Sequence, residues 1–385
     1  MSCGGAGVPP QRVCFFGTFA RQYTVSRALM RACTVAGAEV VECHEPLWEA
    51  AQTKSRSYFG PANVATLLVR YAGCARRLAR RLRTLPRIDA FVVGFQGQLD
   101  MLLLRRLLRE KRRIVFAPLV TLTETLIDDR QVYPPTSLRA RLAHALDAAS
   151  LRSASTVVLD TEAHRDFVVQ SFRLPRSQTS VWYLGCDDEM FRPRPLRQPD
   201  GITRVVFYGS FLPLHGTRTI LEAAALLADD RDIQFELAGD GPERAAAAEF
   251  VQTRKLVNVR LSSWQRYESL QDLIQSADIC LGIFGGGQKA QMVIPNKVYQ
   301  CAAVGRAIIS ADSPAIREVF AHADNIWLCP PVDAAALAQA IRTLSRDSGL
   351  CSRLGGSAAD LMSNRFSPSL QAQRLVALLQ GTGAR

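Results

Sequence analysis

VIPNKVYQCAAVGRAIIS, residues Val293–Ser310, runs from a proline turn into a short apolar helix, through Gly305, and out along a β-branched strand. Pro295 in a first helical turn wastes no hydrogen bond, because an amide at that position has no acceptor within the helix. Lys297 follows closely, and a helix start favours anions through its unpaired amides and its dipole. The stretch therefore predicts a turn, helix and strand of an α/β unit with an anion held at the helix start.

A glycine-rich loop leads into this helix. IFGGGQKAQMVIPNKVYQ (283–300) contains three consecutive glycines, among them Gly286 and Gly287, after an apolar strand. Glycine permits a positive φ and a close approach of the backbone, so such a loop can fold around a ligand. Lys289, Asn296 and Gln300 add polar groups, and Gln300 offers a neutral donor and acceptor to hydroxyl groups. We expect a diphosphate with its sugar nearby; the structural alternative is a surface loop with a solvated lysine.

A second helix start carries a histidine. YGSFLPLHGTRTILEAA (208–224) is interpreted as a strand ending at Gly209 and Ser210, a loop, and a helix that begins at Gly216. His215 precedes this helix start and could donate to the same anion, with capping or packing as the structural alternative. In LAGDGPER (237–244), Asp240 lies in a tight turn that either serves geometry alone or contacts a nucleotide base.

The size and composition are those of a two-domain globular protein. At 385 residues the chain exceeds the roughly 250–300 residues that one hydrophobic core serves. Its ten cysteines show no C-x-x-C pair and no zinc spacing, so we expect reduced thiols and no metal. No apolar run is long enough to cross a bilayer, and the start does not resemble a signal peptide. We therefore expect a cytoplasmic protein, with the inner face of the cytoplasmic membrane as a further location.

Strand-like and helix-like segments alternate in two sets, separated by the proline-rich stretch GCDDEMFRPRPLRQPDG (185–201). The alternation predicts an α/β fold with parallel sheets covered by helices. We expect an N-terminal domain at 1–190, a C-terminal domain at 191–365, and a final helix at 366–385 that returns to the first domain. Ligands of such sheets bind at the carboxyl ends of strands, so a cleft between the domains is the expected site. The predicted strands are 12–19, 39–44, 90–95, 113–120, 155–160, 179–184, 203–210, 233–240, 258–263, 279–284, 306–313 and 326–330.

The net positive charge of the chain falls on its first half. Residues 200–385 hold 18 Lys and Arg against 18 Asp and Glu, so the formal charge of +12 falls on residues 1–199. The segment Arg70–Arg83 has the pattern of a basic amphipathic helix, and attraction to an anionic membrane is worth about 1 kcal/mol per basic residue. A solvated arginine-rich face is the structural alternative. Nucleic acid is the weakest interpretation, because no recognition motif accompanies the charge.

Taken together, the motifs resemble a known family. The order from Gly209 to Gly216, then AGDGPE, Trp264, SADICLGIF and IPNKVYQCAAVGRAIISADSPAIREV is similar to the C-terminal domain of retaining GT-B glycosyltransferases of family 4 (glycosyl transferases group 1). The resemblance covers residues 203–335, and the first half more loosely. It implies two Rossmann-like, doubly wound domains facing each other across a cleft, with a nucleotide diphosphate-sugar in the second and the acceptor against the first. It also implies transfer to an acceptor hydroxyl with retention at the anomeric carbon and no cofactor.

Several donor-binding positions depart from the family pattern. Ser210 and His215 stand where an arginine and a lysine normally hold the diphosphate, and Gln300 replaces a glutamate that contacts the ribose. We therefore assign Lys297 as the main diphosphate clamp and His215 as its partner. The remaining donor-binding residues that the resemblance and the motifs imply are Gly17, Thr18, Gly209, Ser210, Gly216, Asp240, Gly286, Gly287, Lys289, Pro295, Asn296 and Gln300.

The first domain offers only candidates on the acceptor side. In FFGTFARQYTVSRALMRA (15–32), Gly17 and Thr18 end the first strand, where family members approach the donor phosphates. Polar residues that follow later strands could orient an acceptor hydroxyl, although helix capping and solvation are the structural alternatives for such positions. These acceptor-side candidates are Asp100, Glu124, Arg130 and His164.

The interpretation is a transferase that stabilises a leaving diphosphate and aligns its acceptor without an enzyme nucleophile. A membrane-associated acceptor would place it in polysaccharide or glycolipid biosynthesis. Two alternatives stay open. A GT-B-fold sugar-nucleotide epimerase would bind the same donor and need acid and base groups, whereas a GT-B domain without turnover would act as a binding or partner subunit.

Overall fold

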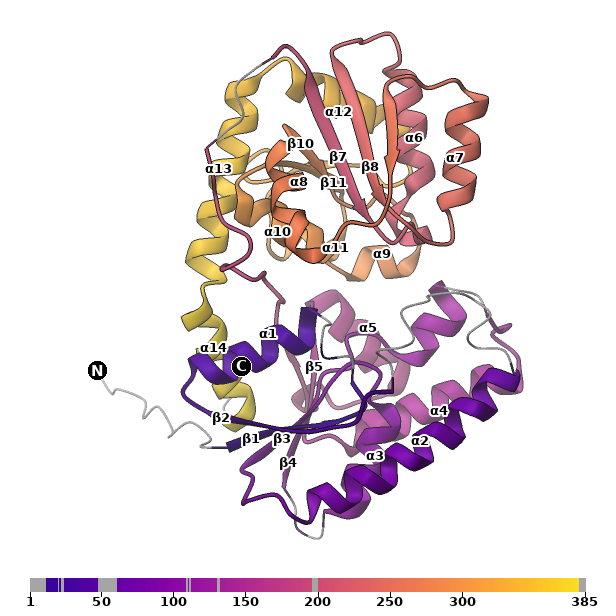
Figure 1. The fold of residues 1–385 in the computed structure, drawn as a ribbon, viewed down its shortest axis with the longest axis vertical. Helices are drawn as coiled ribbons and strands as arrows, with labels where there is room; N and C mark the ends of the chain where they lie inside the picture. Colours follow the sequence, from indigo (N-terminus) through magenta and orange to yellow (C-terminus); the bar gives the residue numbers. More distant parts are fainter. Residues whose placement is uncertain are drawn as a thin grey trace. The chain divides into compact units, whose positions relative to one another are not determined.

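A computed structural model of the chain describes residues 12–19, 21, 24–47, 61–108, 110, 112–129, 132–195 and 200–380. The chain forms two compact units. One unit runs to Leu184 and includes the segment from Pro368, and the other comprises Gly185–Ser367. The boundaries expected at residues 190 and 365 lie a few residues from these breaks, the first in an irregular segment and the second at the last residue of the helix Ser348–Arg365. Each unit has its own sheet and its own core (Figure 1).

The first unit is built on a parallel sheet of six strands in the order β2-β1-β3-β4-β5-β6. Because β1 pairs in parallel with both β2 and β3, the winding direction reverses at β1. The short central strands are buried along their whole length, as expected for a sheet covered on both faces. Their bounds are β1 (Arg12–Gly17), β2 (Glu39–His44), β3 (Ala90–Val93), β4 (Arg113–Phe116), β5 (Thr156–Leu159) and β6 (Thr179–Val181).

Helices cover this sheet, and polar side chains begin two of them. Ser137 Oγ accepts from Ala140 N at 3.2 Å and Thr161 Oγ1 accepts from His164 N at 3.0 Å, which satisfies amides of the first turns of α4 and α5. The helices are α1 (Thr24–Val35), α2 (Pro61–Leu82), α3 (Gln98–Leu107), the π-helix η2 (Glu124–Asp129), α4 (Leu138–Ser153), α5 (Glu162–Phe172), the 3-10 turn η3 (Arg176–Gln178) and α14 (Pro368–Gln380).

The second unit has a parallel sheet in the order β12-β11-β10-β7-β8-β9, and its winding reverses at β7. A core of phenylalanines and branched residues fills both sides of this sheet. The strands are β7 (Thr203–Gly209), β8 (Ile233–Gly239), β9 (Val259–Ser262), β10 (Ile279–Leu281), β11 (Ala307–Ala311) and β12 (Trp327–Cys329).

The helices of the second unit alternate with these strands. They are η4 (Pro213–His215), α6 (Thr217–Leu226), α7 (Arg244–Thr253), η5 (Tyr267–Ser269), α8 (Leu270–Ser276), α9 (Gln288–Met292), α10 (Asn296–Val304), α11 (Pro314–Arg317), α12 (Ala334–Ser345) and α13 (Ser348–Arg365). The expected α/β class with two doubly wound parallel sheets is confirmed. Several predicted strands were too long at their carboxyl ends, where the chain leaves the sheet for a loop.

The last helix completes the first unit. α14 packs against α1, and Leu375 in it is fully buried. Arg113 at the start of β4 donates to Leu378 O at 2.7 Å and 3.1 Å, and Gln371 Nε2 donates to Tyr183 O at 2.8 Å. The segment from Pro368 therefore belongs to the core of the first unit rather than to the second, although it follows the second in sequence.

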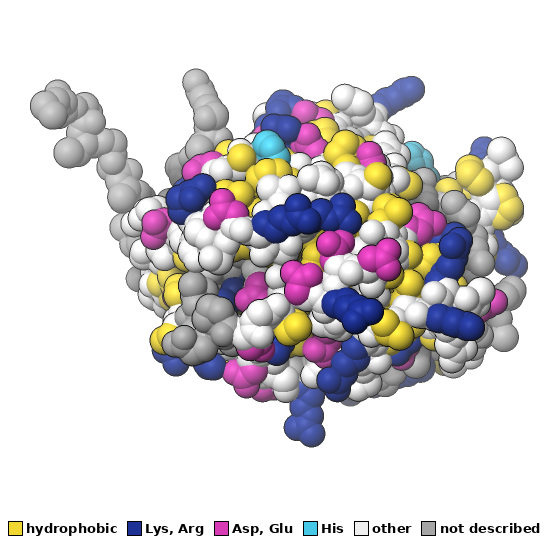
Figure 2. All heavy atoms as spheres, turned by 90° about the horizontal axis from the view of Figure 1, so that it is seen from above, with side chains coloured by type: hydrophobic (Ala, Val, Ile, Leu, Met, Phe, Trp, Pro, Cys, Tyr) yellow, Lys and Arg dark blue, Asp and Glu magenta, His cyan; other side chains and the backbone are white. Residues whose placement is uncertain are grey.

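Surface charge and hydropathy differ between parts of the molecule. On the face drawn in Figure 2, basic and acidic side chains are interspersed with hydrophobic ones. By contrast, the exposed arginines of α2 have no acid among the residues of their own helix. Within the described ranges, no helix combines the length and the apolar character that crossing a bilayer requires.

Leu375→Ala should lower the free energy of unfolding of the first unit by about 2–5 kcal/mol, because it removes a fully buried side chain between α14 and the rest of that unit. Hydrogen exchange of the α1 amides measures this change unit by unit. The exposed Gln373→Ala on the same helix is the control and should leave the exchange rates within a few-fold of the wild type. Equal protection in both variants would show that α14 does not stabilise the first unit.

Candidate donor site and polar networks

Backbone contacts between glycines hold the loops after β7 and β8 together. The two strands end in register at Gly209 and Gly239. A Cβ on Gly239 would lie 1.9 Å from Gly209 O, and one on Gly241 would lie 1.7 Å from Ser210 O. Both glycines have positive φ, at 145° and 146°. Only glycine allows the backbones to approach this closely. The glycines therefore hold the loop after β7 against the loop after β8.

The loop after β7 also contacts the glycine-rich loop after β10. Phe284 N donates to His215 O at 3.0 Å and Gly285 N donates to Leu214 O at 3.1 Å. Gly216 has φ 63°, and a Cβ there would lie 2.5 Å from the carbonyl carbon of Phe284. These contacts fix the start of α6 beside the carboxyl end of β10, at the point where the winding of the sheet reverses.

His215 and Lys297 converge at the end of β7. A Cβ built on Gly209 would lie 2.9 Å from His215 Cε1 and 3.0 Å from Lys297 Nζ. The Phe207 ring lies beneath both groups, with its centroid 3.8 Å from Lys297 Nζ and its plane edge-on to the imidazole at 5.5 Å. The structure therefore brings together the two residues that the sequence assigned to a diphosphate.

The amine of Lys297 is buried without a partner. Only 6% of the residue is exposed, and its Nζ has no hydrogen-bond partner among the residues that the structure describes. Burial lowers the pKa of Lys297 well below its ordinary value. The Phe207 ring face attracts the cation but accepts no ordinary hydrogen bond. An anion placed beside this amine would supply the missing acceptor and favour its charged form.

His215 is oriented by the turn that precedes α6. Its Nδ1 accepts from Leu212 N at 3.4 Å, a long contact that assigns the proton of the neutral ring to Nε2. The residue is buried to 8% exposure between the β7 loop and the start of α6. The ring therefore carries an N–H donor in either protonation state.

Gln300, which was expected to contact a ribose, already forms a hydrogen bond within the second unit. Its Oε1 accepts from Tyr208 OH at 2.7 Å, and Tyr208 in turn lies 3.9 Å from Cys301 Sγ. The amide oxygen expected to meet a ribose therefore already accepts one bond within the unit and keeps one lone pair, and Nε2 is the donor that Gln300 can offer to a ligand. Sequence reasoning missed Tyr208, because its place opposite α10 depends on the packing of the sheet.

The other donor-binding residues predicted in the second unit lie on these loops, on the loop after β8, or at the starts of the helices that follow. Pro295 is the residue before α10 rather than part of its first turn, a correction of one position. Asn296 is the first residue of α10, and its Oδ1 has no partner within the described residues. Asp240 is exposed and accepts from Gly241 N at 2.8 Å. Ser210 is buried directly after β7. Gly286 and Gly287 precede α9, and Lys289 lies within α9.

Asp100 makes its contacts inside the first unit. Its Oδ2 accepts from Thr18 N at 2.7 Å and from Thr18 Oγ1 at 2.9 Å, and its Oδ1 accepts from Tyr71 OH at 3.0 Å. Burial raises its pKa to about 6, although the bonds from Thr18 and Tyr71 oppose the shift. A Cβ on Gly17 would lie 2.5 Å from Oδ2. Asp100 thus holds the turn at Gly17 and Thr18.

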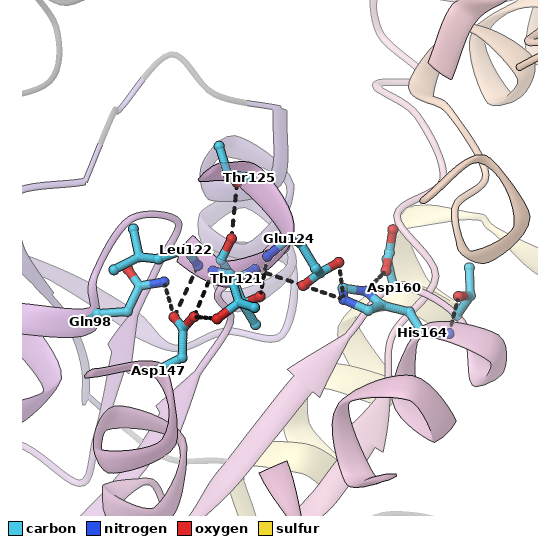
Figure 3. A network of polar contacts seen from close by, with 10 residues as sticks. Gln98, Thr121, Leu122, Glu124, Thr125, Asp147, Asp160 and His164 are labelled. Carbon is cyan, nitrogen blue, oxygen red and sulfur yellow. Dashed lines mark hydrogen bonds and ion pairs between the residues drawn. The ribbon is translucent and has the colours of Figure 1, made fainter. Parts of the chain in front are cut away.

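His164 and Glu124, two acceptor-side candidates, are direct neighbours (Figure 3). His164 Nε2 lies 3.1 Å from Glu124 Oε1, and His164 Nδ1 lies 2.6 Å from Asp160 Oδ1. Burial by itself would lower the pKa of His164, but the two carboxylates outweigh it and raise that pKa to about 10. The pKa of Glu124 is lowered, since His164 and Thr121 outweigh the effect of burial. The group is therefore a buried imidazolium between two carboxylates.

Asp147 supports the segment that carries Glu124 (Figure 3). It accepts from Leu122 N at 3.0 Å and from both Thr123 N and Thr123 Oγ1 at 2.8 Å, while Gln98 Nε2 donates to it at 3.2 Å. Sequence reasoning missed Asp147 and Asp160. Asp160 stands four residues before His164 at the end of a predicted strand, and that spacing was the available indication. Arg130, the fourth acceptor-side candidate, lies outside the described residues.

The sequence is similar to those of known and putative glycosyltransferases. Residues 202–347 match the family described as Glycosyl transferases group 1. The chain is 23% identical over 271 residues to an alpha-D-kanosaminyltransferase of Streptomyces kanamyceticus, covering 65% of this chain and 67% of that protein. It is 23% identical to a putative colanic acid biosynthesis glycosyltransferase, WcaL, of Escherichia coli K12, covering 55% of this chain and 53% of the relative.

Solved structures share the architecture over nearly the whole chain. Anabaena Alr3699/HepE in complex with UDP and glucose has a TM-score of 0.71 at 16% identity, covering 96% of this chain and 99% of that one. A sucrose-phosphate synthase of Thermosynechococcus elongatus has a TM-score of 0.72 at 16% identity, covering 96% and 98%. These likenesses identify the GT-B fold.

Among the described residues, no cluster of three or more His, Cys, Asp or Glu side chains is arranged to hold a metal ion.

His164→Gln should destabilise the first unit by about 3 kcal/mol near pH 6, because it leaves two buried carboxylates without their cation. A pKa raised from 6.5 to about 10 contributes stability that is complete below pH 6.5 and is lost as the pH rises through 10. The difference between wild type and variant should therefore shrink from pH 6.5 to 10 in urea unfolding. His144→Gln, which alters a histidine stacked on Phe172, should keep the wild-type pH slope. A constant difference across this range would rule out the imidazolium.

Proposed function

We propose that this chain, which has the GT-B fold and whose residues 202–347 match the family Glycosyl transferases group 1, is a glycosyltransferase. It moves a sugar from a nucleotide diphosphate-sugar to an acceptor hydroxyl, with retention at the anomeric carbon. The observation that carries the proposal is the buried, unpartnered amine of Lys297 beside His215 at the end of β7. Relatives named as transferases, and a structural neighbour with UDP and glucose, support the same reaction class.

In this proposal, Lys297 and His215 bind the diphosphate. The amine supplies a positive charge where the leaving group gains negative charge, and in a buried site such a charge acts with little screening. His215 donates from Nε2, and the unpaired amides at the start of α6 favour the same anion. Ser210 cannot replace the arginine of the family pattern as a cation, so Lys297 carries more of the charge stabilisation here than that pattern requires.

Retention follows from a front-face displacement without an enzyme nucleophile. The bond from the acceptor oxygen to the anomeric carbon forms as the bond from that carbon to the diphosphate oxygen breaks. The acceptor proton passes to the departing diphosphate, so charge and proton balance within the two substrates. The protein then has to hold the donor, stabilise the leaving group and align the acceptor. We take retention from the family resemblance.

We further infer that the acceptor binds to the first unit and is carried at a membrane surface. The support for the membrane is the excess of arginine along α2 and a relative that is named for colanic acid biosynthesis. Glu124 and His164 would then act by holding the loops at the carboxyl ends of β4 and β5, because both side chains are already paired with each other. The epimerase and binding-subunit alternatives have no counterpart among the named relatives.

Lys297→Ala should lower turnover by about 10²–10³-fold, a typical effect of removing one group that stabilises developing charge. Release of nucleoside diphosphate from a panel of nucleotide-sugars measures this, and the anomeric proton coupling of the product tests retention. Thermal unfolding should be unchanged or shifted upwards, because the variant removes a buried amine without a partner.

Lys255→Ala is the matched control, since it removes an exposed lysine from the same unit. It should keep wild-type turnover. Near wild-type release by Lys297→Ala would remove the amine from the mechanism, and release by neither protein with any nucleotide-sugar would argue against the transferase itself.

A further inference from the structure

A groove lies at the amino ends of β3 and β4 in the first unit. Gly17 and His164 lie at the opposite, carboxyl ends of the strands of this sheet. The volume of the groove is about 610 Å³. The floor is apolar and includes Leu82 at the end of α2, Ile88 and Phe91 at the start of β3, and Leu107 at the end of α3. None of the residues assigned above to donor, acceptor or polar network lines it.

The rim of this groove is cationic. Arg83, Arg87, Arg106 and Arg112 line it, together with one acid, Glu110. Arg112 pairs with Glu110 at 2.8 Å. The other three arginines are exposed and form no ion pair with any residue that the structure describes. Three uncompensated guanidinium groups around an apolar floor complement a ligand that joins an anionic head to a hydrocarbon segment.

Other arginines of α2 are neutralised within the unit. Arg77 lies 2.6 Å and Arg81 3.2 Å from the buried carboxylate of Glu45, and Arg81 also donates to His44 O. The basic segment recognised in the sequence therefore divides into structural arginines, which face Glu45, and arginines that remain available at the surface.

The available arginines continue along one face of α2. Val69, Arg76 and Arg80 follow one another at spacings of seven and four residues, which places them on the same side of the helix, and Arg83 follows in the turn directly after it. Val69 is 75% exposed and the adjacent Leu68 is 53% exposed. This face thus presents Val69 at one end and cations at the other, Leu68 is exposed about 100° around the helix from Val69, and Arg83 connects the face to the rim of the groove.

We propose that this groove and the exposed face of α2 form a docking site for anionic phospholipid at a bilayer surface. The arginines of the rim bind the phosphodiester, the apolar floor receives the upper part of an acyl chain, and Leu68 and Val69 enter the interface. The arginines complement the negative charge of such a lipid, and the apolar floor complements its hydrocarbon chain. The inference deepens the proposed membrane-associated acceptor and rests on that part of the proposed function, but it does not involve the donor site.

Flotation with vesicles of phosphatidylglycerol and phosphatidylethanolamine tests the site in the full chain at about 0.15 M salt. The wild type should bind these vesicles and not pure phosphatidylcholine. The variant R83E/R106E should bind at least about 30-fold more weakly, from about 1 kcal/mol for each basic residue lost. The control R346E/R353E makes the same charge change at two exposed positions of the second unit, one in the turn after α12 and one within α13, and should bind like the wild type.

A second measurement distinguishes the groove from a general attraction. Calorimetry with short-chain phosphatidylglycerol below its micelle concentration should show binding that R83E/R106E abolishes, while inorganic phosphate should not bind. Equal vesicle affinity of the two variants, binding of inorganic phosphate as strong as that of the lipid, or preference for a nucleic acid duplex would each overturn the proposal. Nucleoside diphosphate release should be unaffected by R83E/R106E, so loss of lipid binding and loss of transferase activity are separate outcomes.

Discussion

The buried amine of Lys297 is the constraint on which the rest of the site depends. It lies against the face of Phe207 at the end of β7, without a hydrogen-bond partner among the described residues. An arrangement of this kind opposes folding, because burial disfavours the ammonium and no described residue accepts a hydrogen bond from it. It persists because the surrounding loops contact one another through backbone atoms at Gly209, Gly216 and Gly239, where side chains would not fit. The free energy that folding forgoes here is available to an anionic ligand.

The titratable groups of the first unit show the opposite arrangement. Asp100 binds Thr18 and Tyr71, and His164 is held between Glu124 and Asp160. The carboxylates raise the pKa of His164, and the bonds from Thr18 and Tyr71 oppose the effect of burial on the pKa of Asp100, so both groups have internal partners and stabilise loops rather than await a ligand. A perturbed pKa alone therefore does not identify the reacting site in this molecule. What distinguishes Lys297 is that its shift comes from burial without a compensating acceptor.

Local sequence patterns predicted most of the fold, because strands, helix starts and glycine turns are specified within short windows. Lys297 and His215 were identifiable for the same reason, since each stands next to a helix start. Two features could not be predicted. The bond from Tyr208 to Gln300 joins a strand to a helix far along the chain, and the His164 network depends on the pairing of β4 with β5. Such contacts are set by tertiary packing, which no local pattern contains.

Proton-linked binding of a nucleoside diphosphate, chosen from a panel by its affinity, tests the central claim most directly. Titration calorimetry at about pH 8, repeated in buffers of different ionisation enthalpy, counts the protons taken up on binding. We predict a net uptake of protons, because the diphosphate favours the charged form of an amine whose pKa burial has lowered. Lys297→Met should abolish the uptake and His215→Gln should leave it in place. Binding without proton uptake, or an uptake that persists in Lys297→Met, would contradict the account.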